Sequence, residues 1–276
     1  MLFRSTANLT AHGGFFPHGI WGMWVAVVVS IFSYLSVEMI AVAAGEAERP
    51  AEAVRQAFRA TFARLVLFYL LSLFIILTLA PWTRLQDGTS PFVTVMEMLR
   101  VQYAAGILNA VVVVAALSAM NSMLYITTRM LFSLARGGDA PARFGELNAR
   151  GVPVHALALS TSGMALAAAV YAVVPARAFT VMMALSMFGA LFTWLMIFVT
   201  HYAFRLHHDR SGAPPLPFRM AAFPAGTLLG AMLVAAVLVT TAFTDVFRMT
   251  LVLGVPFLAL LVLSYRLARR GPGARL

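Results

Sequence analysis

The sequence predicts an all-α integral membrane protein with about seven transmembrane helices, and two observations lead to that prediction. Hydrophobic residues make up 61% of the 276 residues and charged residues only 11%, with a mean hydropathy of +0.87. A soluble domain of this length needs a much more charged surface. Apolar runs of about 20 residues also recur along the chain. Each is expected to form a helix, because hydrocarbon offers backbone groups no partner but one another.

Seven such runs predict a single membrane domain over residues 1–276. The third run is too long for one perpendicular crossing, so we expect its end to project from the bilayer and to stop at Gly137 and Gly138. The connecting segments are short and rich in Pro, Gly or Arg. The predicted spans lie at 20–45, 62–81, 102–135, 154–174, 179–204, 223–243 and 247–268.

The first run carries a carboxylate, Glu38, near its middle. An acid at this depth costs roughly 3 kcal/mol on insertion scales unless it is protonated, paired or faces a wet cavity, so it indicates function. Ser33, Tyr34 and Ser36 interrupt the apolar pattern before it, and an opened helix here would free backbone groups to hold substrate or ions. No Pro or Gly at 25–43 predicts such an opening. The structural alternative is a neutral, hydrogen-bonded acid that joins two helices.

The segment after the first run, AGEAERPAEAVRQAFRATFAR, has the pattern of a short amphipathic helix. Glu52, Arg55 and Arg59 share one face, and Pro50 suits the first turn. We expect a solvated connector that lies at the membrane interface.

The third run carries a stripe of polar side chains on one helical face. The spacing of three or four residues aligns them, and lipid would leave them unsatisfied, so the stripe must face protein or water. Lining of a polar pathway and hydrogen bonding that only holds the helix bundle are both open for Ser118 and Asn121. The stripe consists of Ser118, Asn121, Ser122, Tyr125 and Arg129.

Other chemistry has little support in the sequence. The cluster of His201, His207, His208 and Asp209 has metal-ligand residue types, but neighbouring arginines would repel a metal, so none is expected. No GxSxG, P-loop or HExxH motif is present, so we expect no enzyme and no cofactor. A membrane-embedded enzyme that uses His207 and Asp209 is the weakest alternative. The four tryptophans are assigned to interfacial anchoring: Trp21, Trp24, Trp82 and Trp194.

The cysteine content excludes one kind of cross-link, and the distribution of charge predicts the orientation of the chain in the membrane. The chain has no cysteine, so disulfides are excluded. All 20 basic residues are arginines, and the net charge of +10 reflects loop topology rather than nucleic-acid binding. Fifteen of the 20 arginines fall on the side that follows the first, third, fifth and seventh runs. This bias predicts a cytoplasmic C-terminus and an external N-terminus. Because the N-terminal segment lacks the features of a signal peptide, we expect further sequence upstream.

The order of motifs resembles one family. FSYLSVEMIAVAAGEAERP is followed by LVLFYLLSLFIILTLAPWTR, TSPF, ALSAMNSMLYITTRMLFSLARGGDAPARF, RGVPV and WLMIFVTHYAFR. This series resembles the amino-acid permeases of the amino acid–polyamine–organocation superfamily, in particular the bacterial branch of aromatic amino acid, phenylalanine, GABA and proline-type permeases. The opening GGFFPHG is most similar to the proline-type members.

The resemblance implies a LeuT-like permease fold of twelve spans built on two inverted five-helix repeats. The seven runs then correspond to spans six to twelve, that is, the second inverted repeat plus two extra helices. Substrate contacts would come from Phe32, Ser33, Tyr34, Leu35 and Ser36, with Phe32 as an aromatic gate. Glu38 would pack between repeats or couple protons. Relatives usually have glycine before this glutamate, whereas this chain has Leu35 and Ser36.

The implied function is proton-coupled uptake (symport) of an amino acid across the bacterial cytoplasmic (inner) membrane by a multi-pass permease. The expected interior polar or coupling residues are Glu38, Ser118, Asn121 and Tyr125. The expected partners are the amino acid, H⁺, the lipid bilayer and a first repeat that this chain lacks. The alternative is a non-transporting fragment, or a half-transporter that needs a separate chain with the first repeat.

Overall fold

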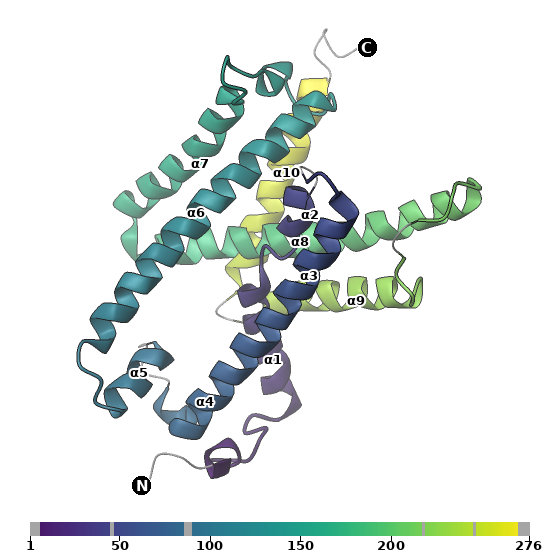
Figure 1. The fold of residues 1–276 in the computed structure, drawn as a ribbon. Coiled ribbons are helices and arrows are strands. Elements are labelled where there is room, and N and C mark those ends of the chain that lie inside the picture. The colour runs from purple at the N-terminus through teal and green to yellow at the C-terminus, as the bar shows by residue number, and fades with distance from the viewer. Residues whose placement is uncertain (1–5, 45–46, 86–89, 217–218, 245–246, 270–276) are drawn as a thin grey trace. The chain divides into compact units, whose positions relative to one another are not determined.

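The computed structural model describes residues 6–44, 47–85, 90–216, 219–244 and 247–269, and these residues form helices joined by turns and short loops (Figure 1). Six helices of the described residues are long and apolar enough to cross a membrane, and Gly19–Ile31 is a shorter apolar helix. The predicted all-α class is confirmed.

Ten α-helices make up most of the described chain. They are α1 Gly19–Ile31, α2 Met39–Ala44, α3 Pro50–Leu65, α4 Leu71–Leu79, α5 Pro91–Met98, α6 Ala104–Arg136, α7 Val154–Val173, α8 Pro175–Arg210, α9 Ala225–Thr240 and α10 Met249–Arg269. A π-helical turn, Val66–Leu70, joins α3 to α4. Short 3₁₀ turns lie at Thr6–Leu9, Phe32–Tyr34, Trp82–Arg84, Ala142–Gly145 and Thr241–Phe243.

The first predicted span, 20–45, is divided rather than continuous. α1 ends at Ile31, a 3₁₀ turn and four turn residues follow, and α2 begins at Met39. We call residues 32–38 the helix break. Within it Ser36 adopts φ of +76°, the left-handed region that glycine favours. The helix therefore breaks even though it has no Gly or Pro at this point.

The predicted connector and the second span form one helical unit. α3, the π-helical turn and α4 run together from Pro50 to Leu79 over 30 residues. The expectation of a separate short connector differs from this structure because no Gly or Pro follows Pro50 before Leu79. Nothing in this segment interrupts the backbone hydrogen bonds, so the amphipathic part continues into the apolar one.

The long third run ends where the sequence predicted. α6 spans 33 residues and stops at Arg136. Gly138 has φ of +81°, and its N–H donates to the Ala135 carbonyl while the Asp139 N–H donates to that of Leu134. These are the two bonds of a Schellman motif, which explains why the glycine pair stops the helix.

The described chain forms two compact units. Residues 1–26 and 40–126 make the first unit, and 27–39 and 127–276 make the second. In the first unit, α5 packs against α4, with Ile76, Ala80 and Val95 buried together. The sequence did not predict α5.

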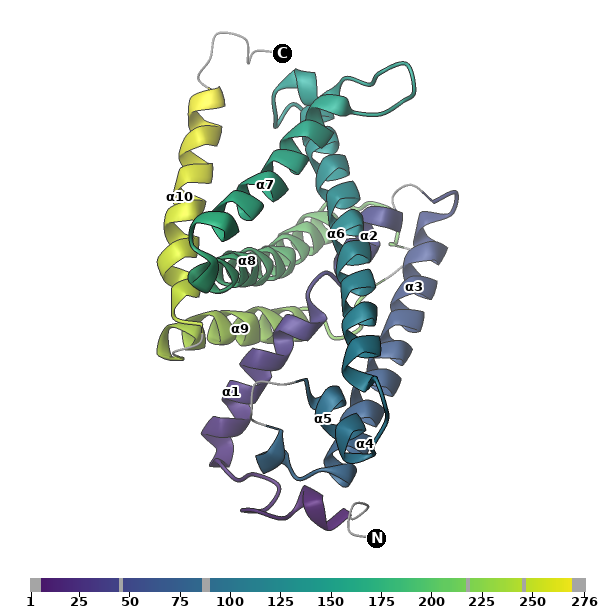
Figure 2. The same cartoon turned by 90° about the vertical axis from the view of Figure 1, so that its left-hand side faces the viewer.

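The second unit is organised around α8, which contacts α7, α9 and α10. α8 and α9 run side by side, and α10 crosses them steeply (Figures 1 and 2). Met187 and Leu191 of α8 are fully buried. α8 also continues to Arg210, six residues past the predicted end of that span. The second unit therefore has one central helix to which its other parts are anchored.

Candidate functional site

The helix break lies in the second unit and contains the predicted substrate contacts. The backbone of Phe32–Tyr34 forms the 3₁₀ turn, and the Met39 N–H donates to the Ser36 carbonyl over 3.1 Å. Ser33 and Tyr34 are exposed, and Leu35 and Ser36 are half-buried. The side chain of Phe32 lies outside what the structure describes, so its role as a gate stays a prediction.

Glu38 is the last residue of the break and forms a hydrogen bond with a residue far along the chain. The indole Nε1–H of Trp194 donates to Oε2 of Glu38 over 2.8 Å, across 156 residues of sequence. Both side chains are half-buried. The bond fastens the end of the break to α8, the central helix of this unit.

Trp194 lies near the middle of α8 rather than at a span end, where the sequence analysis placed it. It lies 17 residues after Arg177 and 16 before Arg210, which bound the candidate span in α8. At 1.5 Å per residue it is about 25 Å from either end. A signal was present in the sequence: an indole N–H in mid-span needs an acceptor when it is not at the wet interface.

The predicted interior residues of α6 belong to a different unit from Glu38. Ser118, Asn121 and Tyr125 are exposed, and they belong to the first unit whereas Glu38 belongs to the second. The Ser122 hydroxyl donates to the Ser118 carbonyl over 3.0 Å, so part of the stripe bonds within its own helix. The shared role of these residues with Glu38 stays a prediction.

The basic and histidine-rich end of α8 contacts both the first turn of α9 and the segment before it. Nδ1 of His201 lies 3.0 Å from the Thr227 hydroxyl, and the Arg205 guanidinium stacks over the Phe223 ring at 4.8 Å. Nη2 of Arg205 is 3.7 Å from a carboxylate oxygen of Asp209. Among the described residues no three His, Asp or Glu side chains are grouped as metal ligands. The geometry of this cluster is that of a helix junction.

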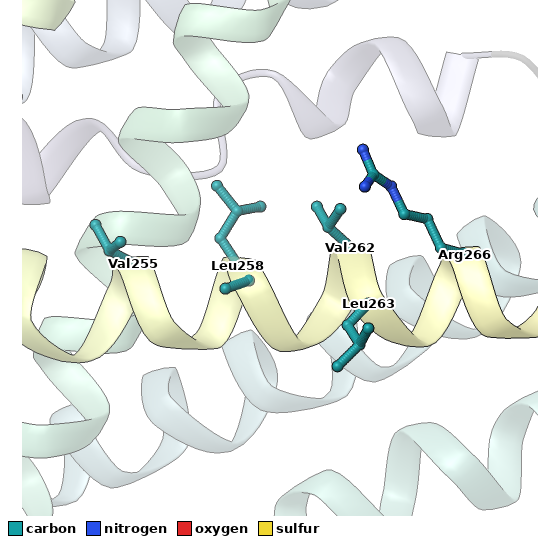
Figure 3. A pocket seen from close by; sticks show the side chains of 6 residues that line it. Val255, Leu258, Val262, Leu263 and Arg266 are labelled. Carbon is teal, nitrogen blue, oxygen red and sulfur yellow. The ribbon is translucent and has the colours of Figure 1, made fainter.

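A shallow depression of about 420 Å³ lies along one face of α10. Figure 3 shows Val255, Leu258 and Val262 on one side of the helix, followed by Arg266, with Leu263 opposite. All its lining residues come from this one helix. An amino acid would find no polar partner there except Arg266, so we do not assign the substrate site to it.

The sequence of this chain matches one protein family over nearly its whole length. The model of the family described as "Amino acid permease" matches residues 3–272. This chain belongs to the amino acid permease family. The resemblance inferred from the motif order is thereby confirmed, and the chain is a multi-pass helical membrane protein of a bacterial transporter family.

Curated relatives of this permease chain agree with the family match. It is 37% identical over 264 residues to a gamma-aminobutyric acid permease of Bacillus subtilis (strain 168), covering 96% of this chain and 56% of the relative. It is 36% identical over 235 residues to the aromatic amino acid transport protein AroP of Escherichia coli (strain K12), covering 85% and 51%. An uncharacterized amino acid permease of Bacillus subtilis (strain 168) is 35% identical over 260 residues, covering 94% and 56%.

The permease chain spans about half the length of the curated relatives it matches. No solved structure matches it significantly. Because the relatives are transporters, the expectation that the chain is not an enzyme is confirmed.

Proposed function

We propose that this chain is the C-terminal part of a permease that carries an amino acid across the bacterial cytoplasmic membrane together with protons. The helix break at residues 32–38 is the observation that carries the proposal. Transporters use discontinuous helices near mid-membrane to bind substrate and coupling ions, because an interrupted helix presents backbone groups that a continuous helix consumes. The family match supplies the substrate class.

The substrate site is formed by the backbone of the break. The regular α-helical hydrogen-bond pattern stops at Ile31, and backbone carbonyl groups at this end of α1 would bind the ammonium of an amino acid. Phe32, Ser33, Tyr34, Leu35 and Ser36 provide this half of the site. The relatives are named for GABA and for aromatic amino acids, which share only an amine and a carboxylate. Recognition in this half of the site therefore rests on those two groups.

Glu38 is the proposed proton carrier. It is the one acid within the break, residues 32–38. Acidic residues within transmembrane segments are typical of proton relays, because burying their charge is costly without a partner. Ser118, Asn121 and Tyr125 of α6 are proposed as further polar residues of the transport pathway.

The other half of the site would come from a first repeat, supplied by preceding sequence or by a separate chain. The match to only 51–56% of these relatives' length supports this. In the membrane the C-terminus would be cytoplasmic and residue 1 external, as the arginine bias predicts.

Uptake by proteoliposomes tests the proposal. The 276-residue chain is reconstituted alone, and also together with any five-span segment that sequencing finds upstream of Met1 or on a neighbouring gene. Entry of a radiolabelled amino-acid mixture is then measured with and without an inward proton gradient. We expect uptake only with the first repeat, and its loss when a protonophore collapses the gradient.

Three results would count against this proposal in different ways. Transport by the chain alone would remove the need for a first repeat. Uptake that ignores the protonophore would remove proton coupling. A lack of uptake in every preparation, or the absence of any first-repeat sequence, would favour a non-transporting fragment. Competition by unlabelled amino acids then ranks the substrates of an active preparation.

A further inference from the structure

The hydrogen bond between Trp194 and Glu38 gives a role to a residue outside the proposed substrate site. We propose that Trp194 is a positioning residue, which holds Glu38 in place and makes the helix break move together with α8. The functional part of this inference rests on the proposed transport activity. The bond itself can be tested without it.

The chemistry of the pair fixes the direction of the bond. An indole can only donate through Nε1–H, and a glutamate side chain accepts through its carboxyl oxygens whether or not it carries a proton. The 2.8 Å separation is that of a well-formed bond. The hydrogen bond from Trp194 can therefore form whether the Glu38 carboxyl is protonated or ionised.

The position of the pair makes the bond important. Trp194 lies at the middle of the candidate span of α8, and both side chains are half-buried. Water is scarce at this depth, so an indole N–H or a carboxyl that lost its partner would find few replacements. The bond is thus favoured over separation of the two groups.

Trp194 belongs to the anchored face of α8. Met187, Leu191 and Trp194 are spaced by four and three residues, which places them on one face of the helix. Met187 and Leu191 are fully buried within the unit. The packed face of α8 therefore continues to Trp194, which gives the indole a fixed place from which to hold a partner.

Glu38, in contrast, lies in a turn between two short helices. The turn contains Ser36 in a backbone conformation that a serine adopts at a cost. No regular helix holds residues 32–38, so the bond to Trp194 is a specific long-range restraint on them. When α8 shifts during transport, the break and Glu38 should follow it.

The first experiment observes the bond directly in the 276-residue chain. The chain carries ¹⁵N-indole tryptophan in lipid nanodiscs, and the Trp194 resonance is assigned by its loss in Trp194→Phe. We expect this resonance to be slow in exchange with D₂O in the wild type and in Glu38→Gln, whose amide oxygen still accepts. In Glu38→Leu we expect a clear shift and at least about tenfold faster exchange, because the acceptor is gone.

The second experiment measures transport by chain reconstituted with the first repeat. Trp194→Phe removes the N–H and keeps an aromatic ring. Trp82→Phe makes the same chemical change at a half-buried indole whose buried Nε1 has no hydrogen-bond partner among the described residues. We expect Trp194→Phe to lower the maximal uptake rate about tenfold with little change in KM, and Trp82→Phe to stay within about twofold of wild type.

Different outcomes test the hydrogen bond, the positioning role of Trp194 and the proposed transport function. A Trp194 resonance that is indifferent to Glu38→Leu would overturn the inference. So would equal uptake by Trp194→Phe and Trp82→Phe, or a Trp194→Phe defect confined to KM, which would place the indole at the substrate instead. If the wild type moves no amino acid, the proposed function fails, and the resonance alone decides whether Trp194 holds Glu38.

Discussion

Ser36 is the residue at which local preference and the observed backbone disagree most clearly in the helix break. Its φ of +76° places the Cβ too close to the following carbonyl, which costs roughly 1–2 kcal/mol for a residue other than glycine. The left-handed turn is thus maintained by the surrounding structure rather than by Ser36 itself. Substitutions of Ser36 should therefore change the stability of the chain according to how well the new residue tolerates a positive φ.

We expect Ser36→Gly to leave the thermal stability of the chain unchanged or raised, because relief of the left-handed strain offsets the greater freedom of glycine in the unfolded chain. Ser36→Val should lower the stability by about 1–2 kcal/mol, since a β-branched side chain tolerates positive φ poorly. Ser33→Gly is the control. Ser33 is outside the set of positive-φ residues, so only the entropic cost remains there. Equal effects of Ser36→Gly and Ser33→Gly would contradict this account.

Arg205 is a buried residue whose side-chain donors are only partly satisfied. Its side chain is 9% exposed, yet Nε and Nη1 have no hydrogen-bond partner among the described residues. Buried, unsatisfied donors cost free energy, whereas the aliphatic stem and the Phe223 contact stabilise.

Arg205→Met should therefore keep the stem packing and remove the unpaired donors. We expect an unchanged or higher melting temperature for this variant in detergent. Arg205→Ala, which also removes the stem, should melt lower because it leaves a cavity. A loss of stability as large for Met as for Ala would show that the guanidinium itself is needed at the α8–α9 junction.

At the scale of elements, the close approach of α10 to α8 depends on one glycine. A Cβ added at Gly254 would overlap the base of the Phe188 ring, which is 4% exposed. Gly163 of α7 offers the opposite situation, because a Cβ there would meet nothing within 4 Å. The two positions make a matched pair within one unit.

We expect Gly254→Ala to lower the free energy of unfolding by about 1–3 kcal/mol through overpacking. Gly163→Ala should leave it unchanged or raise it by up to about 1 kcal/mol, because alanine is the better helix former. Chemical unfolding in mixed micelles, followed by circular dichroism, compares the two. If Phe188→Leu failed to lessen the Gly254→Ala defect, contact with the ring would not be its cause.

The elements also show which information in the sequence is local. The end of α6 was predictable because Gly137 and Gly138 act on the helix they follow. The continuity of α3 with α4 was missed because a change from amphipathic to apolar pattern was taken for a boundary, whereas only backbone chemistry ends a helix. The break was implied by family resemblance alone. The Trp194 partner of Glu38 was missed because no periodicity connects residues 156 positions apart.

At the scale of the whole molecule, the uneven arginine distribution predicts how the chain crosses the membrane. The segment after α8 belongs to the predicted cytoplasmic side, and the turn between α7 and α8 belongs to the external side. The absence of cysteine from the chain provides a clean background in which to test both.

We expect Ala213→Cys to react with a membrane-impermeant maleimide only after cells are permeabilised. Val173→Cys, at a position that is 80% exposed, should react in intact cells. The physical reason is that arginine-rich loops are retained in the cytoplasm during insertion. The reverse labelling pattern would invert the proposed topology, and labelling of both positions in intact cells would show that α8, the helix between them, does not cross.

During synthesis, Glu38 leaves the ribosome well before Trp194 is made. At about 5–20 residues per second, the 156 residues that separate them take roughly 8–30 s to translate. Throughout that interval Glu38 has to enter the membrane, or be kept out of it, without a hydrogen bond from Trp194. The nascent chain therefore passes through a stage in which its most costly side chain has no Trp194 to bind, and a membrane chaperone would find its clearest target in that stage.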